Sequence, residues 1–151
     1  MSRSGYSEEV SEQELNLWRG AVESAIHGKR GQQCLRDLAA ALDAMPTKEL
    51  CVMEFEAHGE VCALGALGRA RGMDMSDLYE GSYPSKVAQR FGVAEALAAE
   101  IMFINDEFWP PVGTRGADIS AARWIEVRKW VESKIAPEQK PGEEQQWNTQ
   151  A

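Results

Sequence analysis

A run of small residues at positions 62–68, Cys-Ala-Leu-Gly-Ala-Leu-Gly, constrains the fold of this chain more than any other feature. The run follows a glycine turn at Gly59, and we expect a buried helix over residues 62–70. Gly65 and Gly68 each lower helix propensity by about 1 kcal/mol relative to alanine. This cost is explained if another backbone passes close to that face of the helix. The run therefore predicts close packing, with a cysteine placed at the start of the helix.

Apolar residues recur at spacings of three and four in several other segments, which is the pattern of helices with one buried face. Ser11 to Glu14 forms a capping box, so a first helix begins there and extends to about Ile26. A tight connection over 28–31 predicts that the first two helices form an antiparallel hairpin. The later helices are expected over residues 32–45, 85–91, 93–105 and from 118 or 120 to 135.

Residues 49–59 leave two interpretations open. The segment 50–55 alternates with a period of two and is rich in β-formers, which is typical of a short strand. A helix is also compatible, and we favour it because no strand partner is evident elsewhere and an isolated hairpin is only marginally stable. The prediction is an all-α protein, a compact bundle of about five to six helices, with a minor β-hairpin near residues 50–62 as the alternative.

At 151 residues the chain is long enough for one domain with its own core. We expect a flexible lead over residues 1–10, a single helical domain over 11–136 and a disordered tail over 137–151. The tail is polar and rich in Pro, Gln and Glu, a composition that buries too little apolar surface to fold. Trp147 in this tail suggests docking, although a chance exposed tryptophan explains it as well.

The net charge of -8 disfavours a general nucleic-acid binder, which needs a basic face to displace counterions from phosphates. Three cysteines at irregular spacing imply no disulfide framework and favour a reducing compartment. The polar first residues carry no signal-peptide pattern, and no apolar run approaches the roughly 18 residues of a membrane span. We therefore expect a cytoplasmic protein that does not enter a membrane.

Cys62 is the candidate for covalent chemistry, because a thiolate nucleophile favours a helix N-terminus with an imidazole nearby. His58 precedes it by four residues and is the candidate general base, and Asn105 or Asp106 is the candidate residue that orients the imidazole ring. The apolar neighbours of Cys62 favour the alternative, a buried cysteine that packs as a small hydrophobe. We favour packing, and keep Cys62, His58 and Asp106 as the catalytic hypothesis.

A zinc site is a weaker hypothesis. Cys51, His58 and Cys62, together with Cys34 or His27, supply enough ligands for a zinc ion. No spacing among them matches a C-x-x-C or H-x-x-x-H motif. We therefore expect neither a metal nor a cofactor.

Residues 86–97 resemble the core of a helix-turn-helix, which would place a DNA-recognition helix over about 94–105. That helix contains Glu95 and Glu100 and no Lys or Arg, so phosphates would repel it. We interpret residues 85–105 as two packed helices joined at a glycine corner. A DNA-binding regulator that uses this segment is kept as an alternative function.

Two further features concern the end of the predicted helix 93–105 and the loops. Asn105 and Asp106 either form a polar helix end, or use their side chains to anchor the next loop or the start of the Cys62 helix.

Aromatic residues in loops are candidate partner anchors, because Tyr and Trp are frequent at interfaces, with local lids over the core as the alternative. These aromatic residues are Tyr79, Tyr83, Phe108 and Trp109.

Four segments carry a resemblance: 18–22 (Trp-Arg-Gly-Ala-Val), 62–67 (Cys-Ala-Leu-Gly-Ala-Leu), Ile101 through Asn105-Asp106, and Arg123-Trp124. Together they resemble a group of small uncharacterised helical proteins encoded by tailed bacteriophages and prophages, over about residues 15–135. The resemblance implies an all-helical, intracellular accessory protein and brings no known activity, ligand or catalytic residue. Phage accessory proteins of this size commonly bind host proteins.

The leading expectation is therefore a non-enzymatic protein that binds an unidentified host protein and occludes a basic surface on it. A small cysteine-dependent hydrolase and a DNA-binding regulator are the alternatives.

Overall fold

The computed structural model describes residues 3–4, 11–79 and 81–137, and this part of the chain forms six α-helices and one short β-hairpin. The all-α bundle that the sequence predicts is confirmed, together with the minor hairpin that it leaves as the alternative. The helices and strands are α1 (Glu12–His27), α2 (Lys29–Ala44), β1 (Glu56–Ala57), β2 (Glu60–Val61), α3 (Ala63–Ala70), α4 (Pro84–Phe91), α5 (Glu95–Asp106) and α6 (Ala117–Lys134).

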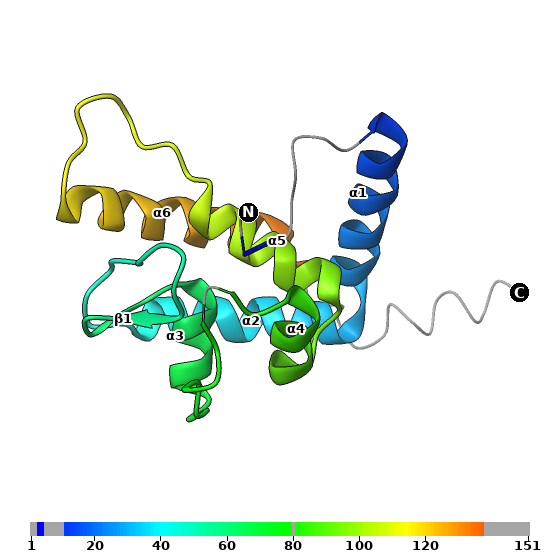
Figure 1. The fold of residues 1–151 in the computed structure, drawn as a ribbon, viewed down its shortest axis with the longest axis horizontal. Coiled ribbons are helices and arrows are strands. Elements are labelled where there is room, and N and C mark those ends of the chain that lie inside the picture. The colour runs from blue at the N-terminus through cyan, green and yellow to red at the C-terminus, as the bar shows by residue number, and fades with distance from the viewer. Residues whose placement is uncertain (1–2, 5–10, 80, 138–151) are drawn as a thin grey trace, which may run out of the picture.

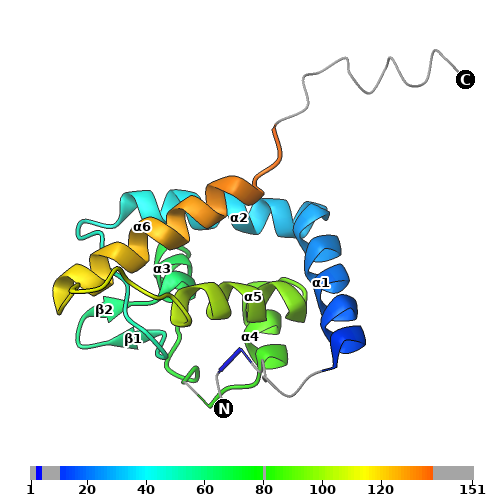
Figure 2. The ribbon, with the colours of Figure 1, turned by 90° about the horizontal axis from the view of Figure 1, so that it is seen from above.

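Two helices organise the bundle. α5 contacts α1, α3, α4 and α6, and α2 contacts α1, α3 and α6. Figure 2 shows α6 lying along α2, and α1 standing across the ends of α2 and α5. The core lies between these helices, and its largest fully buried side chains include Leu35, Leu38, Leu42, Leu64, Leu67, Leu97, Ile101 and Met102.

α1 begins at the predicted capping box. The Ser11 hydroxyl accepts from the Glu14 amide at 3.2 Å, and the Glu14 carboxylate accepts from the Ser11 amide at 3.2 Å. Val22 and Ile26, in the second half of α1, are buried in the core, and Trp18 is partly buried against it, while the start of α1 projects from the bundle (Figure 1). The predicted apolar stripe is therefore buried only at its C-terminal end.

The predicted antiparallel hairpin of α1 and α2 is wrong. Gly28 caps the end of α1 and the start of α2, so no loop separates the two helices. They meet at a corner and point in different directions in both views (Figures 1 and 2). The physical reason is Gly31, where a side chain would collide with the carbonyl group of Ala25, so the last turn of α1 seats directly on the first turn of α2.

The preference for a helix over residues 49–59 is also wrong, and the hairpin alternative holds. β1 and β2 pair antiparallel, with Glu56 opposite Val61 and Ala57 opposite Glu60. The two turn residues, His58 and Gly59, both have positive φ values of 51° and 84°, which is the geometry of a two-residue hairpin turn. The strand partner, Glu60–Val61, lies only three residues along the chain, directly after the glycine turn at Gly59.

The remaining helices lie close to their predicted positions. Cys62 caps α3 instead of belonging to it. α4 begins at Pro84, one residue before the expected Ser85, and Gly92 ends it in the left-handed conformation. A Cβ atom on Gly65 would collide with the carbonyl group of Phe55, which confirms the predicted close approach of another backbone to this helix.

The predicted lead over 1–10 and tail over 137–151 lie almost entirely outside the described residues. Of the lead, only Arg3 and Ser4 are described, and both are buried, at 4% and 2% exposure. These two residues of the expected flexible lead are therefore packed against the rest of the protein. Trp147 lies outside the described part of the chain.

Candidate functional site

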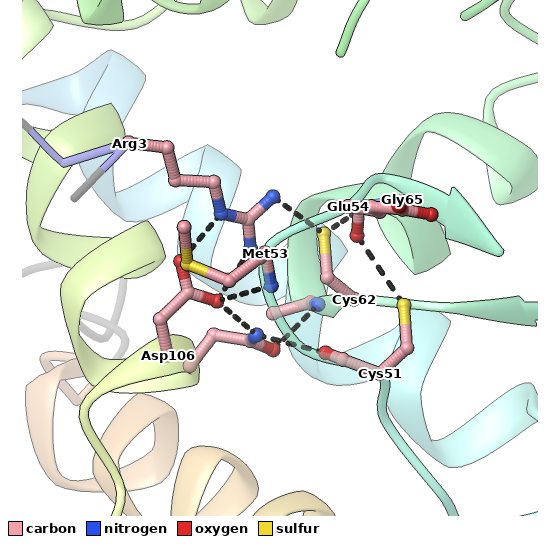
Figure 3. Close-up of polar contacts among 9 residues, drawn as sticks. Arg3, Cys51, Met53, Glu54, Cys62, Gly65 and Asp106 are labelled. Carbon is pink, nitrogen blue, oxygen red and sulfur yellow. Dashed lines mark hydrogen bonds and ion pairs between the residues drawn. The ribbon is translucent and has the colours of Figure 1, made fainter. Parts of the chain in front are cut away.

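The structure brings Cys62 and Asp106 together through a residue that sequence reasoning did not single out, Arg3 (Figure 3). The Arg3 guanidinium donates from Nε to Asp106 Oδ2 at 2.6 Å and from Nη2 to Asp106 Oδ1 at 2.9 Å. Its Nη1 atom lies 3.5 Å from Cys62 Sγ. Its carbon Cζ lies 5.0 Å from the centre of the Phe55 ring. We call Arg3, Phe55, Cys62 and Asp106 the Arg3 cluster.

The ion pair of this cluster is removed from water, since the side chains of Arg3 and Asp106 are 1% and 3% exposed. Burial by itself would lower the pKa of Arg3. The Cys62 sulfur and the Asp106 carboxylate outweigh this effect and raise the pKa above its usual value. The guanidinium therefore stays charged, and the pair is a charge-assisted, bidentate contact in a low-dielectric setting.

Asn105 and Asp106 connect the end of α5 to two other segments. Asn105 Oδ1 accepts from the amide of Ala63 at 3.0 Å, and Asn105 Nδ2 donates to the carbonyl of Cys51 at 3.0 Å. Asp106 Oδ1 accepts from the amide of Met53 at 3.0 Å. The interpretation that these side chains anchor the start of the Cys62 helix is confirmed, and they also hold the segment that precedes the hairpin.

Met53 is held in an unusual backbone conformation. Its φ of 68° lies in the left-handed region, which costs a residue with a side chain about 1–2 kcal/mol. The hydrogen bond from its amide to Asp106 compensates for this cost and draws the segment 51–55 against the end of α5. No sequence signal marks Met53 for this conformation, because glycine or asparagine is the usual residue there.

A second arginine lies close to the cluster. Arg123, on α6, is 7% exposed and donates from Nη1 to the carbonyl of Leu50 at 3.0 Å. Its Nε atom is buried without a hydrogen-bond partner among the described residues. Burial lowers the pKa of Arg123, against the opposing charge of Asp106. The charge of a second arginine therefore acts on the same buried carboxylate, although Arg123 donates to Leu50 and not to Asp106.

The structure supplies only part of the geometry that the catalytic hypothesis requires: Cys62 lies at the start of α3, but His58 is not bonded to it. Cys62 is 0% exposed, and its sulfur accepts from the amide of Gly65 at 3.3 Å, as the cap of α3. His58 lies exposed in the hairpin turn and makes no hydrogen bond to Cys62 or Asp106. A groove of about 260 Å³ lies nearby between α2, α3 and the hairpin, but neither Cys62 nor Asp106 lines it. Among the described residues, the thiol is therefore buried, lies outside the groove and makes no hydrogen bond with an imidazole.

The zinc hypothesis gains no geometric support. In the part of the chain that the structure describes, no three His, Cys, Asp or Glu side chains lie close enough to hold a metal ion. Burial raises the pKa of Cys34 to about 11 and that of Cys51 to about 12, so both stay protonated near neutral pH. His27 lies elsewhere and pairs with Glu23 at 3.3 Å on the surface of α1.

The candidate partner anchors lie in two separate loops. Tyr79 and Tyr83 precede α4 and are 63% and 78% exposed. Trp109 follows α5 and is 88% exposed, whereas Phe108 beside it is half-buried. The connection between α5 and α6 stands clear of the bundle above α6, far from the α3–α4 connection (Figure 1). The four residues therefore do not form one surface.

The helix-turn-helix resemblance corresponds to α4 and α5, which pack closely around the left-handed Gly92. The expected recognition helix, α5, is the central helix of the bundle. Its buried residues are Ala96, Leu97, Ala98, Ala99, Ile101, Met102 and Asn105.

No family model, curated protein or solved structure matches this chain. The fold and the site define a small helical bundle that contains a buried arginine–carboxylate pair beside a helix-capping cysteine. No helix in the described part of the chain is long and apolar enough to cross a membrane.

Proposed function

We propose that this chain is a non-enzymatic binding protein that docks on another protein through residues 107–116, which we call the Trp109 loop. The observation that carries the proposal is the exposure of Trp109, at 88%, together with that of Val112, which is fully exposed. Exposed apolar side chains gain free energy when another molecule covers them, and tryptophan is one of the residues enriched at binding hot spots.

The Trp109 loop is restrained before it binds. Pro110 and Pro111 fix their own φ angles near -65° and restrict the residue before each of them. The turn that follows is closed by Thr114, whose amide and hydroxyl both bond the carbonyl of Pro111, at 3.1 and 2.7 Å. A loop that is already ordered loses less conformational entropy on binding, which favours affinity.

The charge of the chain indicates the kind of partner. A net charge of -8 attracts a basic surface and accelerates association with it. The resemblance to phage-encoded accessory proteins supports a partner from the bacterial host, met in the cytoplasm. The mechanism is occlusion, in which the acidic bundle covers a basic surface of the host protein while the Trp109 loop supplies the anchor.

The two alternatives have weaker support. A cysteine-dependent hydrolase needs a reachable thiolate, whereas Cys62 is buried and its sulfur is occupied by the Gly65 amide and by Arg3. A DNA-binding regulator needs a free recognition helix, whereas α5 packs against four other helices.

A comparative pull-down tests the proposal. Tagged wild-type chain and the double variant Trp109→Ser, Val112→Ser are incubated with bacterial lysate, and the co-purifying proteins are identified by mass spectrometry. We expect a stoichiometric host protein with the wild type and a loss of at least about tenfold with the variant, because a central tryptophan contributes about 2 kcal/mol or more.

Ile125→Ser is the matched control, since Ile125 is also apolar and 62% exposed but lies on α6. This variant should retain the host protein. Equal retention by the Trp109 loop variant and the control would show that the loop is not the docking surface.

A further inference from the structure

The Arg3 guanidinium fills a site whose carboxylate is positioned without it. Asp106 Oδ1 accepts from the amide of Met53 at 3.0 Å and from Nδ2 of Asn105 at 2.9 Å. Asn105 is itself fixed by the amide of Ala63 at 3.0 Å. One oxygen of the carboxylate is therefore held by α5 and by the segment before the hairpin, through contacts that do not involve Arg3.

The other walls are equally independent of Arg3. The Cys62 sulfur is held by the amide of Gly65 at 3.3 Å, as part of the α3 cap. Phe55 is 2% exposed, and its carbonyl accepts from the amide of Cys62 at 3.2 Å. A carboxylate and a sulfur acceptor thus converge on the Arg3 guanidinium from two segments of the chain (Figure 3). The Phe55 ring, from a third segment, lies 5.0 Å from the same guanidinium.

This arrangement selects a guanidinium over an ammonium ion. Two nitrogen atoms of Arg3 donate to the two oxygen atoms of one carboxylate, and a third nitrogen faces Cys62 Sγ. A planar guanidinium satisfies all three contacts at once and also lies over an aromatic ring, whereas a lysine ammonium is a single point charge.

Arg3 is able to leave without the loss of a helix or strand. It belongs to neither, and eight residues, 4–11, separate it from the first residue of α1. The Asp106 carboxylate, which is 3% exposed with Arg3 in place, would lose its charged partner in the vacated site, and a carboxylate that is not fully hydrated is unstable without such a partner. An empty site therefore favours the entry of another cation of the same shape.

We propose that the Arg3 cluster is a receptor for an arginine side chain presented by another polypeptide, and that Arg3 occupies this receptor in cis until a partner's arginine replaces it. The net charge of -8 favours such a basic partner. This inference goes beyond the docking role of the Trp109 loop and does not depend on it.

A peptide titration of the full-length Arg3→Ala chain tests the proposal. The probe is a synthetic decapeptide with the sequence of residues 1–10, Met-Ser-Arg-Ser-Gly-Tyr-Ser-Glu-Glu-Val. The readouts are the ¹H–¹⁵N resonances of Met53 and Gly65, whose amides donate to Asp106 and Cys62. We expect both resonances to shift and saturate with the arginine peptide, and to stay unchanged with a peptide that carries lysine at the third position.

In the wild-type chain, Arg3 competes with the peptide for the same site. A short linker gives its own Arg3 an effective concentration in the mM range, so a peptide with a Kd of about 100 μM for the open receptor binds wild type at least about tenfold more weakly. Equal affinity for the wild type and the Arg3→Ala chain would place the peptide elsewhere and overturn the proposal.

Two paired variants locate the binding. Asp106→Asn in the Arg3→Ala background should abolish the shifts, because the amide side chain has no charge to pair with a guanidinium. Glu107→Gln, which changes the neighbouring exposed carboxylate, should leave binding intact. Retention of binding by the Asp106→Asn chain overturns the proposal. Free L-arginine that binds as tightly as the peptide also overturns it, since the ligand would then be the amino acid.

A cooperative urea transition shows first that the Arg3→Ala chain is folded. Should it be unfolded, the Arg3→Lys chain takes its place, because lysine keeps the charge and makes fewer contacts. The arginine peptide should then displace the substituted lysine side chain at lower concentration than it displaces Arg3 in wild type. The absence of any shift at Met53 and Gly65 with mM peptide would overturn the proposal.

Discussion

Asp106 and Trp109 are three residues apart in the chain, yet their side chains have opposite surroundings. The charged side chain of Asp106 is 3% exposed, and Arg3, Met53 and Asn105 all donate to it. The apolar side chain of Trp109 is 88% exposed. The two residues invert the usual rule that charge lies outside and apolar surface inside.

The difference separates side chains that contribute to the free energy of folding from side chains whose burial can contribute to the free energy of binding. A buried charge is tolerated only when donors surround it, so the contacts of Arg3, Met53 and Asn105 with Asp106 contribute to the stability of the fold. An exposed tryptophan gains nothing from the fold, so its burial free energy is available to a partner. Substitutions in the two regions should therefore separate stability from binding.

Asp106→Ala should have the largest effect on stability. It removes the acceptor for the Arg3 guanidinium and for the Met53 amide, and the loss of one partner of a buried pair typically costs about 3–5 kcal/mol. The free energy of unfolding from urea titration measures this cost. Glu107→Ala, at the exposed neighbour, should change it by less than about 0.5 kcal/mol. If Asp106→Ala and Glu107→Ala lower the free energy of unfolding by similar amounts, the buried contacts of Asp106 do not stabilise the fold, and the contrast with Trp109 fails.

Gly65→Ala should have the next largest effect. Its Cβ atom would collide with the carbonyl of Phe55 and force apart two walls of the Arg3 cluster, at a cost of about 1–3 kcal/mol. Gly20→Ala is the matched control, because Gly20 is exposed on α1 and, among the described residues, no atom beyond its chain neighbours and its own helix backbone lies within 4 Å of its added Cβ. This control should stabilise the chain by up to about 1 kcal/mol through helix propensity. A gain in both variants would mean that α3 does not pack as described.

Alkaline pH should weaken the buried region. Burial raises the pKa of Cys34 to about 11 and that of Cys51 to about 12, above the value of about 8.5 for an unfolded thiol. The folded state therefore favours the protonated thiol. This contribution to stability is complete below pH about 8.5 and is lost as the pH rises toward the folded values, by up to about 1.4 kcal/mol per pH unit for each thiol.

Urea midpoints measured from neutral pH to about pH 10 check this loss. Cys51→Ala should flatten the decline, because it removes the thiol with the higher pKa. The Trp109→Ser, Val112→Ser chain should show the wild-type decline, since the loop carries no thiol. An unchanged slope in Cys51→Ala would mean that other groups cause the alkaline loss.

The sequence predicts features whose cause is local. The capping box at Ser11, the glycine break at Gly92 and the close approach at Gly65 each follow from neighbouring residues or from one cost in helix propensity. The hairpin was misjudged because its partner strand lies only three residues away, in a segment that also suits a turn.

The Arg3 cluster could not be predicted in the same way. Its ion pair joins residues 103 positions apart, and the bond between Asp106 and Met53 spans 53 positions. Nothing in the residues around Arg3 marks this side chain for burial, because the surrounding sequence is polar. The sequence offers the bond of Asn105 to the Cys62 helix as one of two interpretations, because both residues lie at helix ends that need partners.

The smallest expected effect on stability belongs to the Trp109 loop. Trp109→Ser should change the free energy of unfolding by less than about 0.5 kcal/mol, because the side chain is 88% exposed in the free chain. Phe108→Ala, one residue earlier and half-buried, should cost about 1–2 kcal/mol, less than the loss of a fully buried phenylalanine. Urea titration of both variants measures the contrast. If Trp109→Ser destabilises the chain as much as Phe108→Ala, the tryptophan is a lid over the core, and the free energy assigned above to a partner is already used within the fold.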